Sequence, residues 1–178
     1  MSRVILTTIR DDNVTQIKED LFNAFREDHA ALGRMLYDLR TKVTANDITA
    51  AQALAKRLDQ EAGAHIAFEE ADFYPALRPF LSDQEVDEMY KEHAEGLAMV
   101  QHILDLDGSD KLDQRNRNLL IKKIEALETH VSDCGELFGA MGGLSPARLQ
   151  ELWERLNYWR EKAPRWAEIG EKVLTPGL

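Results

Sequence analysis

The chain of 178 residues is long enough for one ordinary domain with its own core, so no disulfide framework is needed. Its formal net charge of −10 at pH 7 argues against a nucleic-acid partner, which clustered Lys and Arg would bind. One cysteine, Cys134, excludes an internal disulfide and suits a reducing compartment, and no apolar run approaches the length of a bilayer span. These features predict a cytoplasmic protein with a single domain over residues 1–178 and no membrane partner.

Four long segments carry apolar residues at three- and four-residue steps, the spacing that forms one stripe along a helix. The first expected helix runs from about Val14 to Val43. The second starts near Asn46 or Asp47, either of which is a suitable N-cap, and ends at Pro79.

The third expected helix begins at Ser82, where the sequence SDQE has the form of a capping box, and ends in DGSD, residues 107–110. The fourth starts after that turn and continues to Gly142. Four long helices joined by short turns can close their apolar stripes by packing antiparallel. The sequence therefore predicts an all-α, up-down-up-down four-helix bundle over about residues 14–142.

An additional C-terminal helix is expected at about residues 145–170. The segment SPARLQELWERLNYWREKAPRW (residues 145–166) opens with a serine N-cap and a proline at the first helical position. It carries three tryptophans, Trp153, Trp159 and Trp166, beside Tyr158. These aromatic side chains either cover the bundle or form the surface of a homodimer, and the sequence leaves both open.

Polar residues with metal-binding side chains interrupt the apolar stripes. Each of the four helices has one histidine in its stripe, and an acid follows the second of them by one turn; the residues are His29, His65, Glu69, His93 and His130. A single buried histidine is more often hydrogen-bonded to some core partner than bound to a metal. Four histidines and an acid would cost roughly 1–3 kcal/mol for each unsatisfied group, and one metal site satisfies them all. Iron, zinc and manganese suit these donors. The fifth histidine, His102, is out of phase and is expected on the surface.

The sequence resembles the hemerythrin-like family of HHE cation-binding domains over about residues 14–142. Four stretches carry the resemblance: EDHAALGRML, HIAFEEADFYPAL, KEHAEGL and ETHVSDCGELF. The second is the most specific, because His-x-x-x-Glu-Glu followed by an aromatic residue and Pro marks the family. The resemblance implies a non-heme di-iron centre with bridging carboxylates, and it implies the metal ligands His29, His65, Glu69, His93 and His130.

Two positions depart from the family pattern. A member usually has a second carboxylate about one turn after the histidine of the fourth helix, where this chain has Cys134 and Gly135. Oxygen-carrying members also have a further histidine where this chain has Leu97. Four histidines and one carboxylate are few donors for two ions, so water or oxo groups would fill some positions.

Three residues are candidates to replace the missing acid. Asp133 could turn inward from its place three residues after His130, or it could be a solvated surface charge. Glu136 could reach the site only if the helix bulges near Gly135. Cys134 could bind the metal as a thiolate, become oxidised, or pack as a small apolar residue. If none of these applies, the centre holds one ion or zinc.

Helical spacing also suggests which residues could contact the expected ligands or a molecule bound to the metal. Glu61, one turn before His65, is expected to accept the second N–H of that imidazole. Tyr37 and Tyr90 could gate a bound oxygen species, although both are more often residues at the edge of a core. Glu70 is expected to be solvated.

The predicted function is oxygen-linked. The chain is expected to bind, sense or react with O2 or another small oxidant, or to handle iron. One alternative is an iron oxidase that uses Cys134 or a tyrosine. The other is a helical interaction protein that acts without metal through its tryptophan-bearing C-terminal helix. No general acid or base stands out, so the sequence leaves open whether the protein is an enzyme.

Overall fold

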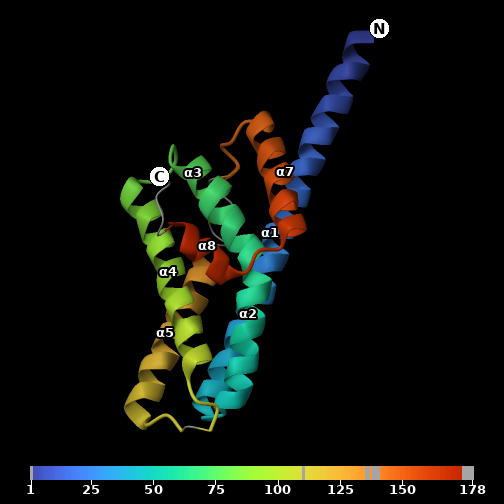
Figure 1. The fold of residues 1–178 in the computed structure, drawn as a ribbon. Coiled ribbons are helices and arrows are strands. Elements are labelled where there is room, and N and C mark those ends of the chain that lie inside the picture. Colours follow the sequence, from blue (N-terminus) through green and yellow to red (C-terminus); the bar gives the residue numbers. More distant parts are fainter. Residues whose placement is uncertain (1, 110, 135–136, 138–140, 174–178) are drawn as a thin grey trace.

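The structure is a computed structural model that describes residues 2–109, 111–134, 137 and 141–173, with the backbone alone at 2–14 and 170–173. All regular secondary structure in these ranges is helical. Four long helices lie side by side (Figure 1), and their bounds are α1 Ser2–Thr44, α2 Ile48–Phe68, α4 Asp83–Asp105 and α5 Gln114–Cys134. α1 packs on α2 and α5, and α4 packs on the same two helices, which closes the ring. The predicted all-α four-helix bundle is confirmed.

The helix starts follow local capping chemistry. The side chain of Asp47 accepts a hydrogen bond from the backbone N–H of Ala50 and so caps α2. Ser82 and Glu85 form the expected capping box at the start of α4. α1 begins twelve residues before the predicted start at Val14, because no glycine or proline interrupts the preceding sequence. Its first turns extend beyond the other helices (Figure 1).

The second expected helix is helical from Ile48 to Leu77, but it contains a π turn that the sequence analysis did not predict. α2 ends at Phe68, a π-helix η1 (Glu69–Phe73) follows, and α3 (Tyr74–Leu77) completes the segment. The N–H of Tyr74 donates to the carbonyl of Glu69, five residues earlier instead of four. The N–H of Tyr74 is used by Glu69, and Pro75 has no N–H to continue this five-residue pattern to Glu70. The carbonyl of Glu70 accepts instead from the hydroxyl of Tyr90 at 2.8 Å.

The C-terminal region forms two helices where one was expected. α7 (Pro146–Lys162) begins at the predicted cap, Ser145. It ends at Ala163, which has a left-handed φ of 42°. The residue before a proline is disfavoured in a helix, and Pro164 follows directly. A separate helix, α8 (Trp166–Val173), then crosses the bundle (Figure 1).

The three tryptophans cover the chain's own core. Trp166 is buried in α8 and packs against the cluster formed by α1, α2, α4 and α5. Trp153 and Trp159 are partly buried against a second cluster near α3 and α7. Tyr158 stays 41% exposed. A homodimer through this region remains a prediction.

The buried apolar side chains fall into two clusters, with a polar layer between them. Along α1, Phe25 belongs to one cluster and Leu32 to the other, and His29 lies between them. Along α4, Met89 and Leu97 flank His93 in the same way. The bundle core is therefore divided at the level of the histidines.

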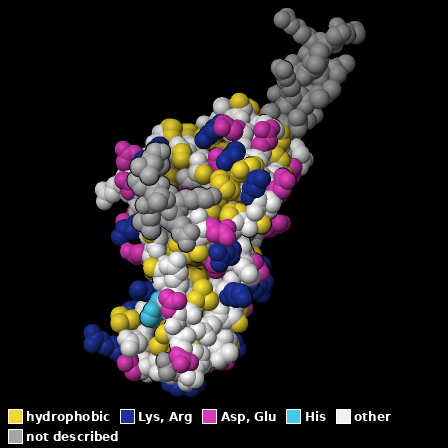
Figure 2. Space-filling view, viewed as in Figure 1, with side chains coloured by type: hydrophobic (Ala, Val, Ile, Leu, Met, Phe, Trp, Pro, Cys, Tyr) yellow, Lys and Arg dark blue, Asp and Glu magenta, His cyan; other side chains and the backbone are white. Residues whose placement is uncertain are grey.

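The surface carries charges of both signs. On the face shown in Figure 2, Lys and Arg side chains are interspersed with Asp and Glu. His102 is exposed, as predicted.

Within the described ranges, none of the helices combines the length and the apolar character that crossing a membrane requires.

Candidate metal centre

The five residues that sequence spacing places in the core stripes meet at one level of the bundle. All are buried, with exposed fractions between 1% and 7%; they are His29 on α1, His65 on α2, Glu69 at the start of η1, His93 on α4 and His130 on α5. The ligand atoms of His29, His65 and Glu69 lie within 4.8 Å of one another. Those of Glu69, His93 and His130 form a second such group.

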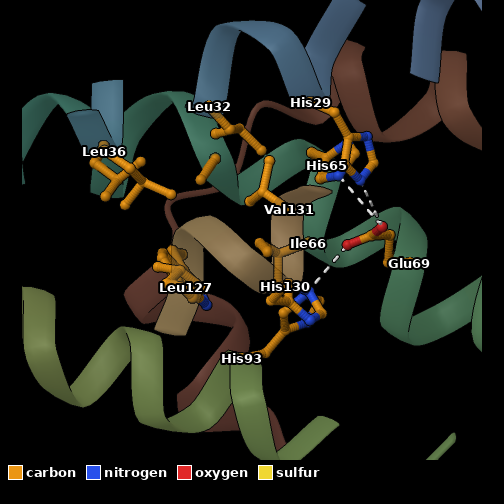
Figure 3. A pocket seen from close by; sticks show the side chains of 13 residues that line it. His29, Leu32, Leu36, His65, Ile66, Glu69, His93, Leu127, His130 and Val131 are labelled. Atoms are coloured by element: carbon orange, nitrogen blue, oxygen red, sulfur yellow. Dashed lines mark ion pairs between the residues drawn. The ribbon is translucent and has the colours of Figure 1, made fainter. Parts of the chain in front are cut away.

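Glu69 lies between the two pairs of histidines (Figure 3). Its Oε1 is 3.3 Å from Nε2 of His65 and 3.7 Å from Nε2 of His29. Its Oε2 is 3.2 Å from Nε2 of His93. One carboxylate therefore belongs to both groups and turns one oxygen toward each.

The outer nitrogen of each imidazole faces an acceptor, which leaves Nε2 directed to the centre. Nδ1 of His29 donates to the backbone carbonyl of Phe25 at 2.8 Å. Nδ1 of His130 donates to Oε2 of Glu92 on α4 at 2.7 Å. Carbonyl and carboxylate oxygens can only accept, so these contacts fix the tautomer with a free Nε2 lone pair, as metal-ligating histidines need.

The partners of His65 and His93 differ from those predicted. Nδ1 of His65 lies 3.4 Å from Oδ2 of Asp28 on α1, at ion-pair distance. The predicted partner, Glu61, is instead paired with Arg57 one turn before it on the outer face of α2. Nδ1 of His93 donates to Oε1 of Glu70 at 3.0 Å.

Glu70, expected in solvent, is largely buried instead. Its side chain is only 14% exposed. Consecutive residues on an α-helix point about 100° apart, and the π turn places Glu69 and Glu70 on either side of one imidazole.

The carboxylate and the imidazoles shift one another's protonation. Burial alone raises the pKa of Glu69, but the imidazoles of His65 and His93 outweigh it and hold that pKa well below its ordinary value. Burial opposes a charge on His65, yet Glu69 and Asp28 raise its pKa to about 9. Burial, together with the charge on His65, lowers the pKa of His29 to about 4. In the absence of a metal, the positive charge of this pair resides on His65.

Two buried atoms in this layer, Oε1 of Glu69 and Nδ1 of His65, have no hydrogen bond of good geometry and make only ion pairs, at 3.3 Å with His65 and at 3.4 Å with Asp28. A buried carboxylate oxygen held only in this way costs free energy compared with one that is fully hydrogen-bonded. A cation between Glu69 and the two Nε2 atoms of His29 and His65 would remove that cost. The donor set of neutral imidazole nitrogens and a carboxylate fits a transition metal such as iron, zinc or manganese.

Tyr74 is the residue at this site that the sequence reasoning missed. It is wholly buried, and its hydroxyl lies 3.1 Å from Nε2 of His93 and 3.3 Å from Oε2 of Glu69. In a regular α-helix, residues five apart differ in direction by about 140°, so Tyr74 would not share a face with Glu69. The π-helix between them makes the contact possible. The adjacent Pro75 was the signal available in the sequence.

The three residues proposed to replace the missing acid differ in their distance from the candidate ligands. Cys134 is buried, with its Sγ 3.6 Å from Nε2 of His130 and 3.9 Å from the hydroxyl of Tyr74. Burial raises the pKa of the Cys134 thiol, so it is neutral without a metal. Asp133 is exposed and belongs to neither ligand group. Glu136 and the bulge expected near Gly135 lie outside the described residues.

The two tyrosines singled out from spacing are away from the ligands. Tyr37 is 59% exposed on α1. Tyr90 is partly buried at the edge of the core, and its hydroxyl is engaged with the carbonyl of Glu70. Leu97 is buried in an apolar cluster.

A small cavity of about 20 Å³ lies beside the ligands. Its walls combine all five candidate ligands with apolar side chains, among them Leu32, Leu127, Val131 and Trp166 (Figure 3 labels the first three). About 10–15 Å³ of such volume holds one water molecule. The space therefore admits a ligand of a few atoms.

Fold and site together define an all-α bundle whose buried histidine and glutamate side chains can hold metal ions. The family model described as Hemerythrin HHE cation binding domain matches residues 20–139, about two thirds of the chain. The chain belongs to this family. A search of the curated proteins and a search of the solved structures gave no match.

Proposed function

We propose that this protein holds two non-heme iron ions between its helices and binds O2 or a similarly small oxidant there. The observation that carries the proposal is the position of Glu69. Its two oxygens face separate histidine pairs, His29 with His65 on one side and His93 with His130 on the other. A carboxylate in that position can bridge two ions, whereas a single ion would leave one pair unused.

The donor set favours iron. Each group consists of two histidines and one carboxylate, and such a triad with open positions is typical of non-heme ferrous sites. Three protein donors per ion also leave room for an external ligand in a six-coordinate shell. When bound, a ferrous pair would supply the electrons that O2 requires on binding.

The surroundings of the ligands favour a very small partner. Leu32, Val131 and Trp166 line the cavity beside the candidate ligands, and its volume of about 20 Å³ suits O2 or peroxide. Asp28, Glu70 and the other outer acceptors keep the imidazoles oriented.

A sensor is a second candidate, because the C-terminal helices contact the site directly. Trp166 of α8 lines the cavity, and Arg160 of α7 pairs with Asp28, the acid beside His65. If the protein is a sensor, the rate of proteolysis within residues 145–173 should differ between the oxidised and reduced iron-loaded forms. Equal rates would contradict this second proposal.

Replacing a ligand tests the proposed function directly. Protein produced in iron-rich medium should contain close to two iron ions per chain by elemental analysis and should absorb visible light. His65→Ala should lower the iron content sharply, because it removes one donor from a group of three. His102→Ala is the matched control, since His102 is exposed, and it should bind iron like the parent. An iron-free parent protein, or equal iron in both variants, would contradict the proposal.

A further inference from the structure

Tyr74 occupies a position that its role as a core residue does not explain. A buried tyrosine hydroxyl usually has a hydrogen-bond partner. Here the hydroxyl is buried in the polar layer, and the polar atoms around it are the inward-facing atoms of the site: Nε2 of His93, Oε2 of Glu69 and Sγ of Cys134.

The spacing of these atoms matches that of neighbouring donors around one ion. The Tyr74 hydroxyl oxygen, Nε2 of His93 and Oε2 of Glu69 form a triangle with sides of 3.1, 3.2 and 3.3 Å. Metal–nitrogen and metal–oxygen bonds of about 2.1 Å at right angles separate adjacent donors by about 3.0 Å. The three atoms are therefore close enough together for one ion to contact all of them.

The carboxylate that the fourth helix lacks would belong to the same half of the site as Tyr74. The group of Glu69, His93 and His130 is the one next to Cys134, where the acid on α5 is missing. The Cys134 sulfur is farther from the hydroxyl, at 3.9 Å, and completes no comparable triangle. A phenol oxygen supplied by Tyr74 would restore a fourth protein donor and, once deprotonated, a second negative charge.

The fold holds the Tyr74 ring in this orientation. Its ring packs edge-on against Tyr90, with centroids 5.3 Å apart, and is tilted against Phe73 at 6.2 Å. The π-helical register of η1 sets the direction of the side chain from the backbone. The hydroxyl therefore does not need to move far to change from a hydrogen-bond partner to a ligand.

We propose that Tyr74 is a further metal ligand, which coordinates as a phenolate the ion held by Glu69, His93 and His130. The proposal rests on the two-iron centre proposed above and adds a residue to its donor set. On coordination, the phenolic proton leaves to solvent as the ion takes its place. A phenolate oxygen at this position would favour ferric over ferrous iron, because it is a hard anionic donor.

The spectrum of the iron-loaded protein tests this assignment. A phenolate bound to ferric iron gives a charge-transfer band in the visible range, and excitation in that band enhances tyrosinate ring vibrations in the Raman spectrum. The parent protein, oxidised and with its iron content measured, should show both signals. Tyr74→Phe should lose both and still retain iron, because the histidines and Glu69 remain.

Tyr90→Phe is the matched control. Tyr90 contacts the Tyr74 ring, but its hydroxyl donates to the carbonyl of Glu70, so the variant should keep the band. Parent protein with two irons and no tyrosinate signal would overturn the assignment and leave the proposed function intact. Parent protein that binds no iron would overturn both. Since the Raman measurement on the parent is decisive, a Tyr74→Phe variant that fails to fold does not prevent the test.

Discussion

At the scale of single residues, the charge on His65 is the feature with the clearest consequence. The pKa of this imidazole is raised to about 9 by Glu69 and Asp28 despite burial, while the pKa of its neighbour His29 is lowered to about 4. At neutral pH the metal-free site therefore carries a proton on His65. A metal ion needs the neutral imidazole, so the ion and this proton compete for the same group.

Metal binding should therefore release protons. Below pH 9, loading the site of His29, His65 and Glu69 should release close to one proton from His65, and the apparent affinity should rise about tenfold per pH unit. The gain should end as the pH passes about 9, where His65 is already neutral. Calorimetric titration with iron(II) or zinc in buffers of different ionisation enthalpy measures the released protons. A release that does not change between pH 7 and pH 10 would contradict the predicted charge state.

The same raised pKa affects the stability of the metal-free fold. Protonated His65 stabilises the folded state relative to an unfolded chain with an ordinary histidine pKa of about 6.5. This contribution is fully present below that value and is lost as the pH rises through about 9. Metal-free protein therefore loses stability across the window in which metal affinity increases.

The convergence of the candidate ligands could be predicted from the sequence, but their outer partners could not. His29, His65, His93 and His130 follow from helical periodicity, because each lies in the stripe of its own helix. Three of their acceptors are set by packing, since Asp28 and Glu92 lie on neighbouring helices and Glu70 depends on the π turn. Spacing within α2 suggested Glu61, which faces outward.

At the scale of elements, the π-helix η1 determines which side chains of the segment Ile48–Leu77 face the candidate metal centre. It lets Glu69, Glu70 and Tyr74 act at one site, which a continuous α-helix would not permit. It is also held from outside, because Asp72 accepts hydrogen bonds from Nε of Arg155 at 2.8 Å and from Nε1 of Trp159 at 2.7 Å. Apolar periodicity does not distinguish a π turn from an α turn over five residues, so the sequence predicted a continuous helix.

The docking of α8 depends on a glycine in α2. A Cβ placed at Gly63 would lie 2.6 Å from the backbone carbon of Arg165 and 2.7 Å from the backbone nitrogen of Trp166, and backbone atoms cannot move aside without shifting α8. Beside it, Asp59 accepts a hydrogen bond from the N–H of Ala167 at 2.9 Å. The helices approach closely because residue 63 has no side chain.

Gly63→Ala should therefore destabilise the protein, although alanine favours helices. We expect a loss of about 1–3 kcal/mol from the steric conflict, seen as a lower midpoint of thermal unfolding, and a red-shifted tryptophan fluorescence as Trp166 leaves the core. The matched control is Gly33→Ala on α1, where the nearest atom is a Val131 methyl at 3.9 Å. That variant should be unchanged or more stable by about 0.5–1 kcal/mol. A Gly63→Ala protein as stable as the Gly33→Ala protein would show that α8 is not docked there.

At the scale of the whole molecule, the layer of candidate metal ligands lies between two apolar clusters. One cluster lies around Phe25, Phe68 and Leu152, and the other around Leu36, Leu58 and Ile124. α1 and α4 pass from one cluster to the other at His29 and His93. Ions held by all four helices would therefore cross-link the bundle where its apolar packing is interrupted. In the same layer, Oε1 of Glu69 has no hydrogen bond of good geometry in the metal-free protein.

Removing metal should therefore lower the stability of the entire bundle. A free metal concentration of 100 times the dissociation constant stabilises the folded state by about 2.7 kcal/mol per site, which for a chain of this size raises the unfolding midpoint by roughly 5–10 °C. Scanning calorimetry of loaded and chelator-treated protein measures the difference. Glu69→Gln keeps the size of the side chain but loses the charge that both ions would share, so its loaded and metal-free midpoints should coincide. His102→Ala should keep the full difference, because that side chain is outside the layer. A Glu69→Gln protein that keeps the full difference between its loaded and metal-free midpoints would show that the ions do not depend on this carboxylate, and the bridging position assigned to Glu69 would have to be abandoned.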